Sequence, residues 1–128
     1  MKSFIAAILL FVLLTGGIVI NSVYILQGCN ELCRYAEEIK SSKSSTELSH
    51  IKAYWDKHRY FFGLTVSEAK TERMDELIIS LFAASKEKNS YEILRICELI
   101  KALSEDIATY ERISLCNASK IDYFLSLF

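Results

Sequence analysis

The stretch FIAAILLFVLLTGGIVINSVYIL, residues 4–26, decides the architecture of this chain of 128 residues. No charged side chain occurs between Lys2 and Glu31, and residues 4–20 are almost wholly apolar. About 20 apolar residues are enough to cross the hydrocarbon core of a bilayer. A lone segment must cross as a helix, because lipid offers no partner to unpaired backbone groups. The sequence therefore predicts a transmembrane helix over residues 1–27.

Three interpretations of this segment compete. A retained signal-anchor helix is favoured over a cleaved signal peptide, because the apolar run is long and no small-residue cleavage motif follows it. The third interpretation is a lipoprotein, since Leu26-Gln27-Gly28-Cys29 resembles a lipobox in which Cys29 would carry the lipid. A short basic head before a long apolar run favours a topology with the bulk of the chain outside the cytoplasm. The larger number of basic residues after the helix favours the opposite topology. The predicted location is the cell membrane, single-pass, with an extracytoplasmic C-terminal domain.

The apolar pattern continues beyond the membrane segment. Its residues recur at alternating steps of four and three: Ile25, Cys29, Leu32, Ala36 and Ile39. This is the heptad spacing of helix-on-helix packing. Residues 28–40 are therefore predicted to extend the first helix, and the serine-rich residues 41–45 to form a linker.

Residues 46–118 contain three more amphipathic segments. Apolar or aromatic residues step by three and four along each of them: Leu48, Ile51, Trp55, His58 and Phe62; Met74, Leu77, Ile78 and Leu81; Ile93, Ile96, Ile100, Leu103, Ile107 and Tyr110. Such stripes with short connections are typical of an antiparallel bundle, in which each helix covers the apolar faces of its neighbours. The predicted fold is all-α: an N-terminal transmembrane helix continues into a small antiparallel helical bundle, and residues 119–128 form an apolar C-terminal tail.

Local signals give the expected ends of these helices. Two pairs of residues match a capping pattern at a helix start: Ser44 with Glu47, and Asn89 with Glu92. Gly63 and Asn117 are expected to end the second and fourth helices. The third helix is expected over about residues 67–88.

Charge and motif content argue against several classes of function. The net charge is −1, so nucleic acid is not an expected partner. No nucleophile–base motif, phosphate-binding glycine loop or metal-ligand spacing occurs, so neither an enzyme nor a bound cofactor or metal is expected. His58 lies on an apolar stripe, where a hydrogen-bonded core histidine is favoured over a ligand.

The cysteines and carboxylates have simple interpretations. The four cysteines are interpreted as buried free thiols, with a disulfide left open: Cys29, Cys33, Cys97 and Cys116. Two groups of carboxylates are interpreted as solvated helix faces with ion pairs: Glu68, Glu72, Asp75 and Glu76, and Glu98, Glu105, Asp106 and Glu111.

Aromatic and basic residues alternate densely in residues 54–62, YWDKHRYFF. At 1.5 Å per residue, the first helix rises roughly 20 Å above the membrane and the second returns by about the same distance, as the fourth does later. Rings and basic side chains are favoured at headgroup level. The candidate membrane-interface residues are therefore Trp55, Lys57, Arg59, Tyr60, Phe61, Phe62, Tyr123, Phe124 and Phe128. The alternative, left open, is that they fill the lower core of the bundle.

The chain resembles bacterial domain-of-unknown-function family 4363, which comprises small membrane-anchored proteins. The resemblance rests on the N-terminal anchor, the helix that bears Trp55, the charged third helix and the ending Ile113-Ser114-Leu115-Cys116-Asn117, which is similar to a Leu-Ser-Leu-x-Asn close. Ala118 and Ser119 depart from the apolar residues that the family tends to place after the asparagine. The resemblance implies this architecture and no known activity.

The expected function is a non-catalytic interaction or structural module of the cell envelope. Its expected partners are the lipid bilayer and either an unknown protein or a second copy of the chain. The rival hypothesis is a small-ligand sensor of four-helix type, which needs a cavity lined by convergent polar groups. His58 and Tyr110 are the candidates for that cavity.

Overall fold

The computed structural model describes residues 1–42 and 45–126, with the side chains of residues 1–42 and 46–117. Every element in these ranges is a helix: α1 (Lys2–Ser42), α2 (Ser45–Thr65), α3 (Glu68–Lys86) and α4 (Ser90–Ser126). The all-α prediction is therefore confirmed. Residue 43 and the predicted capping residue Ser44 lie outside the described residues, whereas residues 41, 42 and 45 of the predicted linker belong to α1 and α2.

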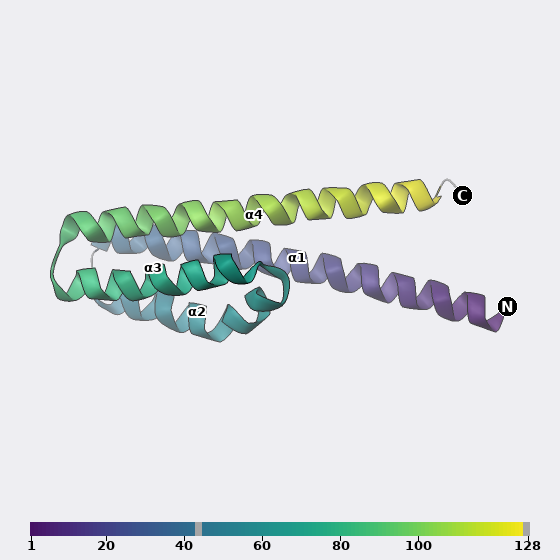
Figure 1. Cartoon of the computed structure of the whole chain (residues 1–128), viewed down its shortest axis with the longest axis horizontal. Helices are drawn as coiled ribbons and strands as arrows, with labels where there is room; N and C mark the ends of the chain where they lie inside the picture. Colours follow the sequence, from purple (N-terminus) through teal and green to yellow (C-terminus); the bar gives the residue numbers. More distant parts are fainter. Residues whose placement is uncertain (43–44, 127–128) are drawn as a thin grey trace.

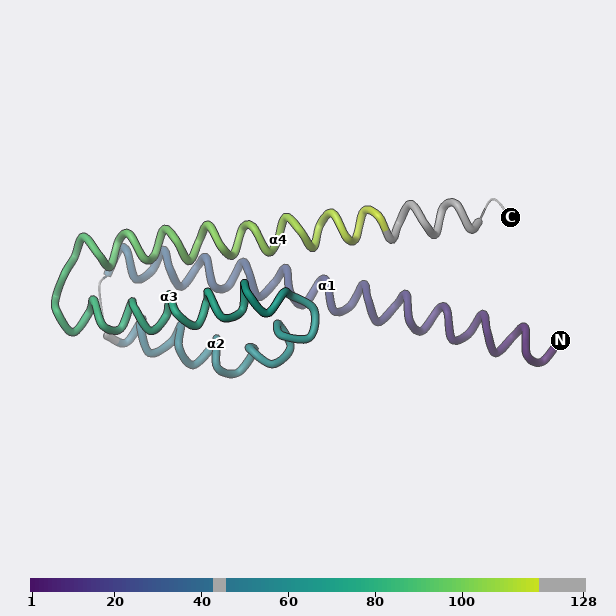
Figure 2. The backbone as a smooth tube through the Cα atoms, viewed as in Figure 1, coloured from purple at the N-terminus to yellow at the C-terminus, as the bar shows by residue number. Residues whose placement is uncertain are grey.

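The four helices of the described chain form an antiparallel bundle (Figure 1). α1 packs on α2 and α4, and α3 packs on the same two helices, so that each helix has two neighbours. α1 is much longer than the bundle, and its N-terminal half extends past the turn between α2 and α3 (Figure 1). The C-terminal part of α4 also extends past this turn, toward the same end of the molecule as the N-terminal half of α1 (Figure 1). The tube in Figure 2 shows α1 entering the bundle without a break.

The core confirms the apolar stripes predicted from the sequence. All five stripe residues of the first helix are buried, as are Met74, Leu77, Ile78 and Leu81 of α3. α2 contributes four large side chains to the core: Leu48, Ile51, Trp55 and Phe62. The four amphipathic helices are held together because their apolar faces pack on one another and exclude water from these side chains.

The helix ends follow the sequence signals in part. Ser67 accepts a hydrogen bond from the backbone N–H of Lys70 and caps α3, and the Asn89 side chain accepts one from the N–H of Glu92 at 3.2 Å. These are the caps expected of short polar side chains, which satisfy N–H groups that have no partner in the first turn. The end of α3 is closed by Lys88, which has a φ of 53°.

Gly63 and Asn117 do not end their helices. α2 continues to Thr65 and α4 to Ser126. A helix that ends at glycine or asparagine usually does so in the left-handed conformation. Within the described residues, Lys88 alone among non-glycine residues has a positive φ and no glycine does, so the helical path simply continues through both positions.

Candidate functional site

The N-terminal half of α1 is an exposed apolar helix. No residue of its most apolar 18-residue window is buried, and α1 is the one helix of the described chain that is long and apolar enough to cross a membrane. The second half of the same helix supplies seven buried residues, from Ser22 to Ile39. The helix therefore changes at Ser22 from an apolar segment in which no residue is buried to a core helix of the bundle.

Polar side chains surround the point where this change occurs. The Ser22 hydroxyl donates a hydrogen bond to Oε2 of Glu111 at 3.0 Å, and the Asn21 amide donates one to the Thr65 hydroxyl. These two bonds join α1 to α4 and to the end of α2. We call Asn21, Ser22, Thr65, Tyr110 and Glu111 the polar base of the bundle.

Glu111 corrects one prediction from the sequence. It was grouped with Glu98, Glu105 and Asp106 on a solvated face, and those three are exposed, but Glu111 is only 3% exposed. Tyr110, expected on the buried stripe, is 61% exposed.

The cause of this error is the phase of the last turns of the fourth helix. Its buried positions near the base run from Ser104 through Ile107 and Ala108 to Glu111. These steps of three and four residues were available in the sequence. Residue type alone favours the core for Tyr110 and solvent for Glu111, whereas helical position exposes Tyr110 and buries Glu111.

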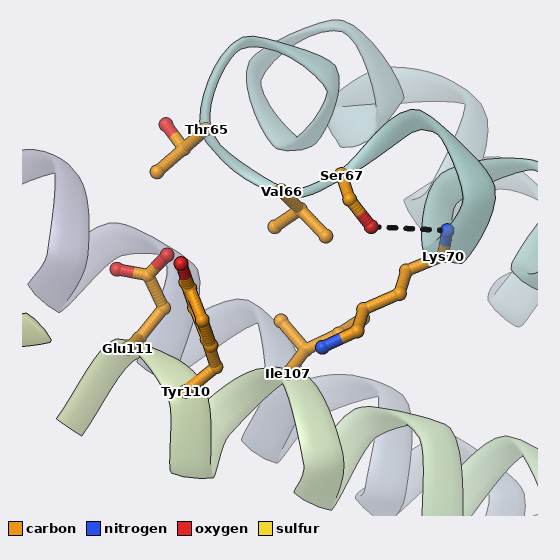
Figure 3. Close-up of a pocket in the computed structure, with 7 residues that line it drawn as sticks. All are labelled: Thr65, Val66, Ser67, Lys70, Ile107, Tyr110 and Glu111. Atoms are coloured by element: carbon orange, nitrogen blue, oxygen red, sulfur yellow. Dashed lines mark hydrogen bonds between the residues drawn. The ribbon is translucent and has the colours of Figure 1, made fainter. Parts of the chain in front are cut away.

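Two cavities meet at the polar base. One has a volume of about 390 Å³ and lies between the α2–α3 turn and α4, lined by Thr65, Val66, Ser67, Lys70, Ile107, Tyr110 and Glu111 (Figure 3). The other has a volume of about 410 Å³ and lies between α1 and α4, lined by Ile18, Asn21, Ser22, Thr65, Tyr110, Glu111 and Ser114. Thr65, Tyr110 and Glu111 line both, and Ile18 belongs to the exposed apolar half of α1.

Large apolar and aromatic side chains are exposed at the same end of the bundle. They come from the end of α2 and from α4: Tyr60 (70%), Phe61 (50%), Leu64 (66%), Tyr110 (61%) and Ile113 (54%). We call these five residues the collar. They lie where α1 leaves the bundle, since Thr65 and Tyr110 line a cavity together with Ile18.

The predicted membrane-interface residues divide into three groups. Trp55 and Phe62 fill the core at 1% and 0% exposure, which is the alternative that the sequence had left open for them. Four others are exposed: Lys57, Arg59, Tyr60 and Phe61. Tyr123 and Phe124 belong to α4, but their side chains lie outside the described part of the chain, as does the whole of Phe128.

Trp55 and Arg59 converge on one carboxylate of α3. The indole Nε1–H of Trp55 donates to Oδ1 of Asp75 at 2.6 Å, and the Arg59 guanidinium lies 2.7 Å from Oδ2. Hydrogen bonds from Arg59 and from Trp55, against the opposing effect of burial, lower the pKa of the Asp75 carboxyl. These interactions join α2 to α3, so Asp75 and Arg59 have a structural role.

His58 lies in an aromatic cluster on the α1–α2 face. Its Nδ1 is hydrogen-bonded to the Tyr24 hydroxyl, and its ring centroid is 4.3 Å from that of Tyr54. Burial lowers the pKa of His58 and raises that of Tyr54 to about 12. His58 and Tyr24 line a cavity with Gln27, Asn30, Glu31 and Tyr54, whereas Tyr110 lines the cavities at the base. The two residues predicted to share a sensor pocket therefore lie in different cavities.

Several other charged residues form ion pairs on exposed faces. Within helices, Arg34 pairs with Glu31 and Glu38, Arg73 pairs with Glu76, and Arg95 pairs with Glu92. Between α1 and α4, Lys40 pairs with Glu98 and Lys101 with Glu37. Exposed pairs of this kind contribute little to stability, about 0 to 1 kcal/mol each.

All four cysteines are free in the structure. Cys29 and Cys97 are buried, and burial raises the pKa of their thiols to about 12 and about 11. Cys33 is half-buried and Cys116 is exposed, so the predicted burial of all four thiols is wrong for these two. The sulfur of Cys29 lies in the core, in the middle of α1.

The chain has no match among the protein-family models, the curated proteins and the solved structures. Among the side chains that the structure describes, no group of three or more His, Cys, Asp or Glu residues is placed to hold a metal ion. The geometry of the exposed helix and of the polar base therefore carries the functional argument.

Proposed function

We propose that this chain is a single-pass membrane protein in which residues 4–20 of α1 cross the bilayer. The helical bundle then lies on the extracytoplasmic side and serves as a non-catalytic interaction or structural module of the cell envelope. The observation that carries the proposal is the contrast within α1: its apolar window is wholly unburied, while the same helix from Ser22 onward is core.

The exposed half of α1 is difficult to explain in water. A core helix of a soluble protein has its apolar face buried by other helices, whereas here none of residues 4–20 is buried. A contiguous apolar surface of this size marks a membrane or interaction site. Lipid covers such a helix on all sides and needs no matching protein surface.

The continuity of α1 supports a retained helix over a cleaved one. The buried residues of the bundle begin at Ser22, directly after the apolar segment, and no break separates the two parts. A helix that belongs half to the membrane and half to the core holds the bundle at a fixed height above the bilayer. This rigid link suits transmission of a signal or support of an assembly better than a flexible tether would.

The collar gives the expected level of the membrane surface. Tyr60, Phe61 and Tyr110 are aromatic side chains at the end of the bundle from which the apolar helix emerges. Aromatic rings are enriched at the boundary between lipid and water. We infer that the collar rests at the headgroup level and that the exposed Lys57 of α2 lies just above it, where it can meet anionic lipids.

Membership of domain-of-unknown-function family 4363 is part of this proposal. The N-terminal anchor and the helix that carries Trp55 are the features on which the resemblance depends. It supports the architecture and adds no activity.

A pair of substitutions tests membrane insertion. Leu10→Arg places a charge at the middle of the proposed span, where it costs roughly 2.5 to 3.5 kcal/mol. We expect the variant chain to be released from membranes by alkaline carbonate, while the natural chain stays in the pellet. Ile79→Arg is the matched control, because Ile79 is an exposed apolar residue of α3 at 66% exposure, outside the proposed span. Equal retention or equal release of both variants would contradict the proposal.

A further inference from the structure

The two cavities at the polar base have an unusual charge arrangement. Glu111 is the one buried charged side chain of the described chain, and its hydrogen-bond donor is the neutral Ser22 hydroxyl. No lysine, arginine or histidine of the described chain lies within ion-pair distance of it. Burying a carboxylate without a cation is costly. A cationic ligand group at this point would supply the missing partner.

A second charge of opposite sign lines the cavity between the α2–α3 turn and α4, which we call the upper cavity. The cavity between α1 and α4 is the lower cavity. Lys70 of α3 reaches down toward α4, and its ammonium lies beside Ile107, as Figure 3 shows. It lies 5.1 Å from the centre of the Tyr110 ring and 3.1 Å from Oδ2 of Asp106. The side chain of Asp106 is 62% exposed, so water screens this pair and Lys70 can turn to another anion. One cavity therefore offers a carboxylate and an ammonium from opposite walls.

We propose that these cavities bind the ethanolamine phosphate headgroup of a bilayer lipid, with its ammonium on Glu111 and its phosphate on Lys70. The inference deepens the proposed membrane anchorage and rests on it. The two cavities have volumes of about 390 and 410 Å³, within the range of ~300 to 1,000 Å³ that is usual for small-ligand sites.

The lower cavity argues for a lipid over a free amine. It lies between α1 and α4 and reaches Ile18, which belongs to the proposed membrane span. A lipid bound by its headgroup in the upper cavity can pass its glycerol and acyl chains along Ile18 into the bilayer. A free phosphoethanolamine or polyamine has no apolar part to fill that path.

The hydrogen-bonding groups around Glu111 favour a primary ammonium. Thr65 and Tyr110 line both cavities and carry hydroxyl oxygens that accept hydrogen bonds. A primary ammonium donates three hydrogen bonds, so it can satisfy Glu111 and these hydroxyls together. The trimethylammonium of a choline headgroup donates none, and a glycerol headgroup carries no cation. The site should therefore prefer phosphatidylethanolamine to phosphatidylcholine and phosphatidylglycerol.

Native mass spectrometry of the full-length protein in detergent tests this preference. The protein is mixed with the three lipids in equal amounts and with identical acyl chains. Loss of one hydrogen bond to a charged group is expected to weaken binding roughly tenfold or more, so phosphatidylethanolamine should dominate the bound fraction. Equal occupancy by the three lipids would overturn the proposal.

Two variants with matched controls locate the site. Glu111→Gln should abolish the preference for phosphatidylethanolamine, whereas Glu105→Gln, the same change at an exposed position of α4, should keep it. Lys70→Met should lower the occupancy by this lipid, whereas Lys86→Met, at the exposed end of α3, should not. Circular dichroism of each variant shows whether it is folded. A folded Glu111→Gln chain that keeps the preference refutes the site.

Further measurements separate the possible failures. Soluble phosphoethanolamine, which has no acyl chains, should bind at least about tenfold more weakly than the lipid, and equal affinity would refute the assignment to a lipid. A chain that stays in carbonate-washed membranes but shows no lipid preference refutes the headgroup site alone. A chain that carbonate releases from membranes refutes the anchor itself.

Discussion

The Phe62 ring of α2 lies directly against Gly28 of α1. A methyl group at Gly28 would lie 2.6 Å from Cζ and 2.7 Å from Cε2 of that ring, far inside van der Waals contact. Phe62 is fully buried and also packs edge-on against Trp55, with 5.3 Å between ring centroids. The absence of a side chain at Gly28 thus sets the distance between the two helices.

Gly28→Ala should therefore destabilise the bundle. Forcing an extra methyl group into a packed core costs about 1 to 3 kcal/mol, which exceeds the gain of about 1 kcal/mol from replacing a helical glycine by alanine. The thermal unfolding midpoint, followed by circular dichroism in detergent, should fall. Gly63→Ala is the matched control, because no atom lies within 4 Å of a Cβ at Gly63, and its midpoint should rise. A midpoint that rises equally in both variants would disprove the close contact.

The Asp75 carboxylate should make the stability of the bundle depend on pH. Its pKa is lower in the folded chain than its ordinary value, chiefly because Arg59 donates to it. A depressed pKa contributes stability that is present above the unfolded value, about 3.9, and is lost as the pH falls toward the folded value. Acidification below about pH 4 should therefore destabilise the natural chain more than the Asp75→Asn variant.

The comparison for Asp75 uses denaturant unfolding followed by Trp55 fluorescence. At neutral pH, Asp75→Asn should lower the free energy of unfolding by roughly 1 to 3 kcal/mol, because charge-assisted hydrogen bonds from Arg59 and Trp55 are weakened. Asp56→Asn is the matched control, because it removes an equally charged group that is exposed and paired with Lys52. It should change the free energy of unfolding by less than about 1 kcal/mol. Similar effects of the two variants would contradict the role of Asp75.

The four thiols should react at very different rates. Cys116 is exposed, whereas Cys29 and Cys97 are buried and have pKa values raised to about 12 and about 11. The thiolate is the reactive species, so maleimide should modify Cys116 first in the folded chain and the two buried thiols only after unfolding. Peptide mass spectrometry measures the order. Modification of Cys29 before Cys116 would contradict its place in the core.

The intact mass of the membrane-purified protein tests the state of the N-terminus. We expect the full chain with residues 1–28 present and no lipid on Cys29, because that cysteine lies in the middle of a continuous core helix. A mass that corresponds to a chain beginning at a lipid-modified Cys29 would support the lipoprotein interpretation. A chain shortened within residues 1–27 would support a cleaved signal peptide.

Periodicity predicted most of the fold because it reports directly on burial. The steps of three and four from Ile25 to Ile39 and from Ile93 to Ile107 gave the inward faces of α1 and α4, and Leu103 alone among those positions of α4 is only partly buried. Helix ends were predicted less well. Glycine or asparagine ends a helix through the left-handed conformation, and the sequence does not show whether Gly63 and Asn117 adopt it.

The candidate site was harder to predict because it depends on contacts between distant segments. Ser22 and Glu111 are far apart in sequence, and neither residue is unusual alone. Glu111 was assigned to solvent because it is charged, and Trp55 was a candidate for lipid because its neighbours are aromatic and basic. The structure buries Glu111 and places Trp55 in the core, the alternative left open for it, since burial in this bundle follows helical position more closely than residue type.

Cysteine labelling in intact cells tests the central claim most directly. Ser3→Cys and Ser80→Cys, each in a Cys116→Ser background, place an exposed thiol before the apolar helix and on α3. A membrane-impermeant maleimide should label the thiol at position 80 in intact cells and the one at position 3 only after permeabilisation. Labelling of both positions in intact cells, or of position 3 alone, would contradict a helix that crosses the bilayer with its bundle outside.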